Sequence, residues 1–300
     1  MRVAFTGKGG SGKTTISSLF AQIAASDGYR VLAMDADINQ HMASALGHPN
    51  TLRSMGTDAE SIKSYLRGSN ELIDTHGMHK TTPPGTGSSL VRLTPDDWFV
   101  EEFAQSVSKN LWVAGAGEIP EGNVGVRCYH GLNGAVELVL GHMLDKQEDI
   151  VAVDMTAGAD AFSSSLFTKV DVLVLVVEPT LKSLSVYDQF KKHANDYGIP
   201  IIIVANKVQD EGDKVFIADR VGQVDSWIGV SAEVRRRERG EKPSDVEANT
   251  IEQLRQLRER LLEKPIDWRK REELSYRMHR RAVTRPAIDA SFSLERAAAL

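Results

Sequence analysis

The fold is decided by one stretch near the amino terminus, Val3-Ala-Phe-Thr-Gly-Lys-Gly-Gly-Ser-Gly-Lys-Thr-Thr-Ile16. A short apolar run, Val3–Phe5, precedes a glycine-rich turn, and from Thr14 to Ala25 apolar residues recur at helical spacing. This order of strand, glycine loop and helix is the context in which G-x-x-x-x-G-K-[ST] cradles phosphate groups. Residues 7–14 therefore predict a phosphate-binding loop, or P-loop.

The residue types in this loop suit different parts of a nucleotide. Main-chain N–H groups of a glycine-rich turn can point inward at an anion, and the following helix N-terminus adds partial positive charge. We expect Lys13 to reach the β- and γ-phosphates, the Thr14 hydroxyl to bind Mg²⁺ and Thr15 to lie near the α-phosphate. The loop residues predicted to bind nucleotide are Gly9, Gly10, Ser11, Gly12, Lys13, Thr14 and Thr15.

Strand-like and helix-like segments alternate along the rest of the chain. Further strands are expected at residues 29–34, 111–113, 150–153, 172–177, 201–205 and 227–230, and further helices at 135–144 and 183–197. Continuous apolar strands that alternate with helices indicate a mostly parallel sheet with helices on both faces. The predicted fold class is therefore α/β, a doubly wound P-loop NTPase sheet.

Two regions fall outside this alternation. From residue 47 to 94 the chain is polar and rich in turn residues, which favours an insertion or a mobile lid. Residues 266–300 follow the last expected strand and are predicted to form a helical C-terminal extension. We expect a P-loop ATPase domain over residues 1–265, with 47–94 inserted in it.

The composition narrows the possible classes of protein. With 300 residues, 41% hydrophobic and 26% charged, the chain can bury a sizeable core, which excludes a disordered protein. A net charge of -5 argues against nucleic-acid binding by bulk charge. The longest apolar runs are far short of the ~20 residues of a membrane span, and no secretory signal is visible, so we expect a cytoplasmic protein without membrane insertion.

The loop contains a second lysine, Lys8, in the run Lys8-Gly-Gly-Ser-Gly-Lys-Thr-Thr15. This deviant Walker A motif resembles that of the MinD/ParA family of P-loop ATPases. In that family the extra lysine reaches across a dimer to the partner's nucleotide. The resemblance therefore implies an ATP-dependent homodimer in which Lys8 acts in trans, supplying an ammonium group to the transition state.

Carboxylates follow two of the expected strands. The run Asp35-Ala-Asp37-Ile-Asn39 resembles the switch I of the family, where the acidic residue that matches Asp37 orients or activates the attacking water. Asp35 is expected either to contact the magnesium shell or to cap the following turn. The apolar run that ends in Asp154 resembles a Walker B strand, which implies that Asp154 binds Mg²⁺ through water and that the Gly158 amide senses the γ-phosphate.

The base of the nucleotide is expected to bind at the ends of two later strands. The family places an adenine-reading asparagine where this chain has Asn206, followed by Lys207, and an amide can both donate and accept on a purine edge. Ser231 is expected to complete the base pocket from the next loop. Glu178 starts a Glu-Pro-Thr turn, and a purely structural role is an open alternative for it.

The resemblance is closest to the CooC-like branch, whose members insert nickel into carbon monoxide dehydrogenase, on the runs Asp154-Met-Thr-Ala-Gly158 and Val177-Glu-Pro-Thr-Leu-Lys-Ser183. That branch binds a metal at the dimer interface with a Cys-x-Cys pair. This chain instead has the lone cysteine Cys128 followed by His130, so two chains would supply two sulfurs and two nitrogens, which suits Zn²⁺ or Ni²⁺. The alternative is a buried structural cysteine.

These features predict a Mg²⁺-dependent, ATP-hydrolysing dimeric switch that serves as an accessory or maturation ATPase and delivers metal to a client enzyme. A positioning or partition ATPase acting on DNA or membrane is an alternative, as is a P-loop kinase for a small molecule. The basic clusters near the carboxyl terminus are interleaved with glutamates, as on solvated helices, so nucleic acid is not the expected partner.

Overall fold

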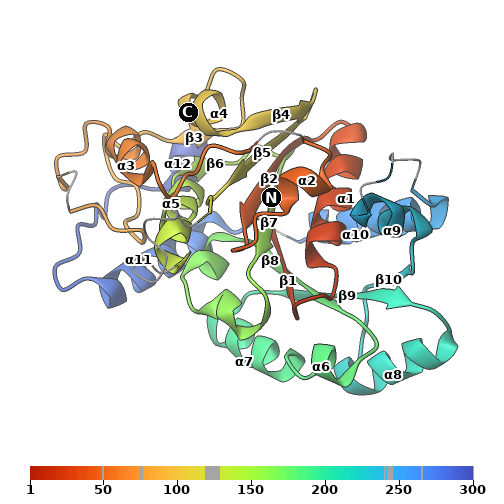
Figure 1. The fold of residues 1–300 in the computed structure, drawn as a ribbon. Helices are drawn as coiled ribbons and strands as arrows, with labels where there is room; N and C mark the ends of the chain where they lie inside the picture. The colour runs from red at the N-terminus through yellow and green to blue at the C-terminus, as the bar shows by residue number, and fades with distance from the viewer. Residues whose placement is uncertain are drawn as a thin grey trace.

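An eight-stranded sheet lies at the centre of the protein (Figure 1). Its strands are β1 (Arg2–Gly7), β2 (Arg30–Ala36), β4 (Gln105–Ser108), β5 (Leu111–Gly115), β7 (Asp149–Met155), β8 (Val172–Val177), β9 (Ile201–Val208) and β10 (Ser226–Gly229). Their order is β10-β9-β8-β1-β7-β2-β5-β4, and only the β4–β5 pair is antiparallel among the described strand pairs of this sheet. A separate parallel pair joins β3 (Val91–Arg92) to β6 (Met143–Leu144).

The helices connect these strands and cover the sheet. They are α1 (Lys13–Ser26), α2 (Met42–Ala45), α3 (Ala59–Arg67), α4 (Trp98–Phe103), α5 (Tyr129–Gly141), α6 (Leu181–Leu184), α7 (Tyr187–Tyr197), α8 (Glu211–Val221), α9 (Ala232–Glu238), α10 (Ala248–Leu262), α11 (Trp268–Ala282) and α12 (Leu294–Ala298), with short 3-10 helices η2 (Gly158–Phe162) and η3 (Leu166–Lys169). This computed structural model describes residues 1–48, 51–74, 77–118, 129–239, 241, 246–264 and 266–299, except for the side chains of residues 129, 130, 159, 237 and 238.

Successive side chains of a central strand enter the cores on opposite faces of the sheet. In β2, Val31 and Ala33 pack into the core beneath α1 and α10, whereas Leu32 and Met34 pack into the core that contains α3, α5 and α7. Figure 1 shows α1 and α10 on one side of the sheet and α5 and α11 on the other. Because neighbouring side chains along a strand alternate between faces, a continuously apolar strand is buried on both. The predicted α/β fold class is confirmed.

The expected strands are all present, but two helix predictions were partly wrong. The helix predicted at 135–144 is α5, which begins earlier, at Tyr129, and ends at Gly141, because Met143 and Leu144 pair as a strand with β3. The helix predicted at 183–197 is divided into α6 and α7. The edge strand β4 was missed because its residues alternate between half-buried and exposed, without a continuous apolar run.

The polar segment at residues 47–94 contributes more to the core than its composition predicts. Its helix α3 buries Ile62 and Leu66, and Met55 is also fully buried. The Met55 and Gly56 N–H groups donate to carbonyls at the end of β5, at 3.2 and 2.8 Å. The described part of this segment is therefore packed on the domain, and a lid function for it stays a prediction.

A buried ion-pair network attaches the C-terminal extension to the sheet. Arg271 of α11 donates from Nη1 to Asp145 at 2.8 Å and lies 3.4 Å from Asp171. Arg2 at the start of β1 binds the same Asp145 at 2.9 Å, and its N–H donates to Asp171 at 2.8 Å. Burial alone would raise the pKa of Asp145, but the two guanidinium groups hold it well below its usual range. The helix α11 is thus anchored to β1 by charges that cannot reach water.

None of the helices in the described ranges is both long and apolar enough to cross a membrane. The cytoplasmic location stays a prediction.

We predict that Arg271→Ala destabilises the protein by about 3–5 kcal/mol, because it removes one of the two guanidinium groups that compensate the buried carboxylates of Asp145 and Asp171. The matched control is Arg269→Ala on the same helix. Arg269 is 84% exposed and pairs with Glu295 at 3.2 Å, so its loss should cost no more than about 1 kcal/mol. Urea unfolding of both variants measures the difference. Equal stabilities for the two variants would contradict the anchoring role of Arg271.

Candidate nucleotide site

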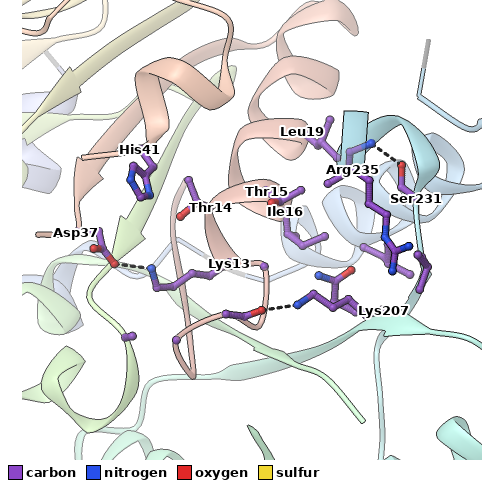
Figure 2. Close-up of a pocket in the computed structure, with 18 of the residues that line it drawn as sticks. Lys13, Thr14, Thr15, Ile16, Leu19, Asp37, His41, Lys207, Ser231 and Arg235 are labelled. Atoms are coloured by element: carbon purple, nitrogen blue, oxygen red, sulfur yellow. Dashed lines mark hydrogen bonds and ion pairs between the residues drawn. The ribbon is translucent and has the colours of Figure 1, made fainter. Parts of the chain in front are cut away.

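A cavity of about 970 Å³ lies at the carboxyl ends of the parallel strands, beside the P-loop (Figure 2). Its walls come from the P-loop and α1, from the segments after β2 and β7, and from the ends of β9 and β10 with α9. The predicted site residues that line it are Gly9, Gly10, Gly12, Lys13, Thr14, Thr15, Asp37, Asn206, Lys207 and Ser231. The structure therefore brings most of the predicted nucleotide residues together around one cavity.

The start of α1 has the backbone geometry of an anion site. Gly12 adopts a left-handed conformation with φ 92°, and a Cβ atom there would lie 2.2 Å from Nδ2 of Asn206. No side chain caps the first turn, which begins at Lys13. The N–H groups of that turn are therefore available to an anion, and the helix dipole favours a negative charge there.

Lys13 and Asp37 form a buried ion pair inside the cavity, and Figure 2 shows the two side chains pointing toward one another. Burial alone would lower the pKa of Lys13, but the carboxylates of Asp154 and Asp37 raise it above its ordinary value. The other oxygen of Asp37 accepts hydrogen bonds from the N–H and the side-chain amide of Asn39, at 3.0 and 2.9 Å. Both oxygens of the predicted catalytic carboxylate thus have partners.

Thr14 and Asp154 form a set of oxygens that fits Mg²⁺. The Thr14 hydroxyl donates to Oδ2 of Asp154 at 2.5 Å. Oδ1 of Asp154 is buried and has no hydrogen-bond partner within the described ranges. Burial raises the pKa of Asp154 to about 6, although Lys13 and Thr14 act in the opposite direction. A hard divalent cation would satisfy the free oxygen and offset the burial of the charge.

Asp35 organises the switch segment. One of its oxygens accepts the Asp37 N–H at 3.1 Å, and the other accepts the Met42 N–H at the start of α2, at 2.8 Å. Burial, with the charge of Asp154, raises the pKa of Asp35 to about 7. These bonds correspond to the turn-capping alternative, and contact of Asp35 with magnesium stays a prediction.

Asn206 and Lys207 hold the P-loop from the end of β9. Asn206 donates from Nδ2 to the Ser11 carbonyl at 2.9 Å, which leaves its Oδ1 as the acceptor for an adenine amino group. Lys207 donates from Nζ to the Gly10 carbonyl at 2.5 Å and pairs with Glu178 at 3.0 Å. Glu178 thus supports the lysine that holds the P-loop, and both its purely structural role and base reading by Asn206 stay predictions.

Ser231 caps the helix α9. Its hydroxyl accepts the Val234 N–H at 3.0 Å and donates to Glu247 at 2.6 Å. Around it the cavity wall is apolar, formed by Ile228, Val230 and Val234. Apolar groups next to a polar rim suit a flat heteroaromatic ring. Ser231 lines the cavity, but its hydroxyl is used within the protein, and a base pocket at this place stays a prediction.

Other predicted residues lie away from the cavity wall. Lys8 is half-buried, does not line this cavity, and its ammonium group has no hydrogen bond or ion pair with any described residue. Gly158 starts η2 directly after the lining residue Ala157 and does not itself line the cavity. Cys128 lies outside the described residues, as does the side chain of His130. Among the side chains that are described, no group of three metal-ligating residues occurs.

Several residues of the site were missed by the sequence analysis. His41 and Arg235 line the cavity, and Figure 2 shows Arg235 on the side opposite Asp37, near Ser231 and Lys207. His41 follows the switch segment directly, which could have signalled it. Arg235 lies in a basic, glutamate-containing run that is typical of an exposed helix, so nothing in its sequence context indicated a place in the cavity wall.

Comparison with known protein families gives a match over most of the chain. Residues 3–264 match the model of the CobQ/CobB/MinD/ParA nucleotide binding domain. The carbon monoxide dehydrogenase accessory protein CooC of Rhodospirillum rubrum is 33% identical over 227 residues, which cover 75% of this chain and 81% of that protein. An ATP-binding protein of Methanocaldococcus jannaschii is 28% identical over 264 residues, covering 86% and 96% of the two chains.

Solved structures show the same fold at low sequence identity. The septum site-determining protein MinD of Pyrococcus horikoshii, complexed with Mg-ADP, has a TM-score of 0.57 at 16% identity and covers 87% of this chain and 94% of its own. A plasmid partition protein of Borrelia burgdorferi bound to AMPPNP has a TM-score of 0.57 at 15% identity, over 88% and 98% of the two chains. At these identities the likeness concerns the fold alone.

Proposed function

Because the chain belongs to the CobQ/CobB/MinD/ParA family of nucleotide-binding proteins, we propose that it is a magnesium-dependent ATPase that works as a two-chain switch. The observation that carries this proposal is the buried Lys13–Asp37 pair beside the contact between Thr14 and Asp154. A cation for phosphate, a carboxylate for water and oxygens for Mg²⁺ thus meet at one cavity.

ATP binding would rearrange the Lys13–Asp37 pair. The N–H groups at the start of α1 hold the phosphate chain, and Lys13 turns from Asp37 to the β- and γ-phosphate oxygens. Asn39 keeps one oxygen of the Asp37 carboxylate, and the other becomes free. Asp37 is therefore released when the phosphates of a bound nucleotide draw Lys13 away from it.

Hydrolysis would follow from this release. The freed oxygen of Asp37 accepts a hydrogen bond from a water molecule and orients it toward the γ-phosphorus. The water oxygen bonds to that phosphorus as the bond between the phosphorus and the bridging oxygen of ADP breaks. One water proton stays on the new oxygen and the other passes by way of Asp37 to a phosphate oxygen, which gives ADP and inorganic phosphate. Bound Mg²⁺ supplies positive charge for the phosphate oxygens, and Thr14 and Asp154 are the residues that would hold it, Asp154 through water.

The second chain would complete the site through Lys8. This lysine belongs to the P-loop but does not line the cavity of its own chain, and its ammonium group has no hydrogen bond or ion pair within the described residues. A face-to-face dimer would carry each Lys8 to the nucleotide of the other chain. Closing on ATP and opening after phosphate release then gives two states that a client protein can distinguish.

The client is proposed from the relationship to CooC. The identity of 33% over three quarters of the chain supports an accessory ATPase that matures a metal enzyme. Cys128 and His130 of two chains would hold the metal cargo as Zn²⁺ or Ni²⁺. Adenine-nucleotide turnover would then set when the dimer accepts or gives up the ion.

Substitutions at Asp37 and Lys13 should separate hydrolysis from binding. We predict that Asp37→Ala binds ATP at least as well as the wild type but lowers kcat by about 100-fold or more, because the water loses its acceptor. Lys13→Ala should weaken ATP binding by roughly 10- to 100-fold. The control is Asp219→Ala, an exposed carboxylate on α8. Phosphate release without a second substrate, together with calorimetry, provides the measurement. Wild-type turnover in Asp37→Ala would refute the assignment, and turnover that requires a small-molecule acceptor would indicate a kinase.

Substitution of Lys8 should affect assembly rather than binding in one chain. We predict that Lys8→Ala binds ATP about as tightly as the wild type but does not dimerise with ATP and Mg²⁺, since its charge is needed across the interface. Light scattering with and without ATP measures the change, with the exposed Lys109→Ala as the matched control. A Lys8→Ala protein that still forms the ATP-dependent dimer would rule out action in trans.

Metal content tests the proposed cargo site. We predict that the purified dimer holds about one Zn²⁺ or Ni²⁺ ion per two chains, and that Cys128→Ser loses it, because a thiolate is the stronger ligand of the pair. Elemental analysis after gel filtration measures the ratio. Equal metal content in the wild type and in Cys128→Ser would disprove a site at Cys128.

A further inference from the structure

The main chain around Asp37 is held by three side chains. The N–H of Asp37 donates to the Asp35 carboxylate at 3.1 Å. The carbonyl of the preceding residue, Ala36, accepts from Nδ2 of Asn133 at 3.1 Å. The carbonyl of Asp37 accepts from Nε2 of Gln40 at 2.5 Å. Each polar main-chain atom flanking the Asp37 side chain thus has a side-chain partner, which fixes the direction in which the carboxylate leaves the backbone.

Gln40 makes its contribution from a strained backbone. Its φ angle is 50°, in the left-handed region that residues with a Cβ atom rarely adopt and that glycine adopts readily. Strained residues of this kind persist where the surrounding contacts require them, and they gather at functional sites. Glycine could form a turn of the same shape at lower conformational cost. The presence of glutamine at this position therefore points to a role for its side chain.

The amide of Gln40 connects two parts of the structure. Besides donating to Asp37, it accepts the Gly117 N–H at 3.0 Å through Oε1. Gly117 follows the strand β5, whose last residue, Gly115, pairs with Asp35. The side chain therefore fastens the switch segment after β2 to the neighbouring strand end, and both functional groups of the amide are used in doing so.

We propose that Gln40 is a positioning residue for ATP hydrolysis, holding Asp37 so that its carboxylate meets the attacking water at the required angle. The inference rests on the proposed function, since it concerns the same water. Gln40 does not touch the carboxylate of Asp37: its amide donates to the carbonyl of Asp37 and, at 3.4 Å, to Oδ1 of Asp35, the oxygen that accepts the Asp37 N–H. When the amide is lost, the peptide unit after Asp37 can rotate, and the carboxylate samples orientations that do not align the water.

The experiment compares Gln40→Gly and Gln40→Ala with the wild type. Glycine relieves the positive φ, so Gln40→Gly should be more stable in thermal unfolding than Gln40→Ala, which keeps the strain and lacks the same hydrogen bonds. Both lack the amide, so kcat should fall by about 10- to 100-fold in each, while KM for ATP changes by less than about twofold. Gln223→Ala, an exposed glutamine, should keep the wild-type kcat.

A double-mutant cycle tests whether the effect passes through Asp37. In the Asp37→Ala background, Gln40→Gly should cause no further loss of kcat, because there is no carboxylate left to position. A stable Gln40→Gly protein with wild-type kcat would overturn the inference and leave the proposed function intact. The inference would also be overturned if Gln40→Gly lowered kcat by the same factor in the Asp37→Ala background as in the wild type. Absence of ATP hydrolysis by the wild type would overturn the proposed function and this inference together.

Discussion

Parallel pairing at the centre of the sheet is the constraint on which the site depends. β1 lies between β7 and β8, and β7 also pairs with β2, so the carboxyl ends of these strands meet at one edge. The register sets Phe5 and Asp35 opposite Asp154. The residues that follow β2 and β7 are therefore placed beside the P-loop by strand pairing itself. In open α/β sheets this edge is where ligands bind.

The second feature is the concentration of buried charge at that edge. Asp35, Asp37 and Asp154 are all buried, and Lys13 lies among them. Carboxylates removed from water are costly unless a cation or several hydrogen bonds compensate. Asp35 is compensated by main-chain N–H groups and Asp37 by Lys13, whereas Asp154 keeps a free oxygen. The free oxygen of Asp154 would be satisfied by Mg²⁺, and the phosphates of a bound nucleotide would offer Lys13 a second anionic partner.

The sequence revealed those parts of the site that are local in the chain. The P-loop was predictable because its spacing, its glycines and its flanking strand and helix are contiguous, and Asp37 and Asp154 because each follows an apolar strand. Gln40 and Arg235 could not be identified in this way, since their roles come from contacts with Gly117 and with the cavity, which only the tertiary fold creates. The same holds for the anchoring of α11, where Arg271 resembles its exposed neighbours in sequence but is buried against Asp145.

The account depends on the P-loop binding a magnesium nucleotide, and isothermal titration calorimetry tests this most directly. With Mg²⁺ present, titration of the 300-residue protein with ATP should give a saturable heat with one nucleotide bound per chain, and the affinity should fall when Mg²⁺ is removed with EDTA. No detectable binding of ATP or ADP to the folded wild-type protein would contradict the account.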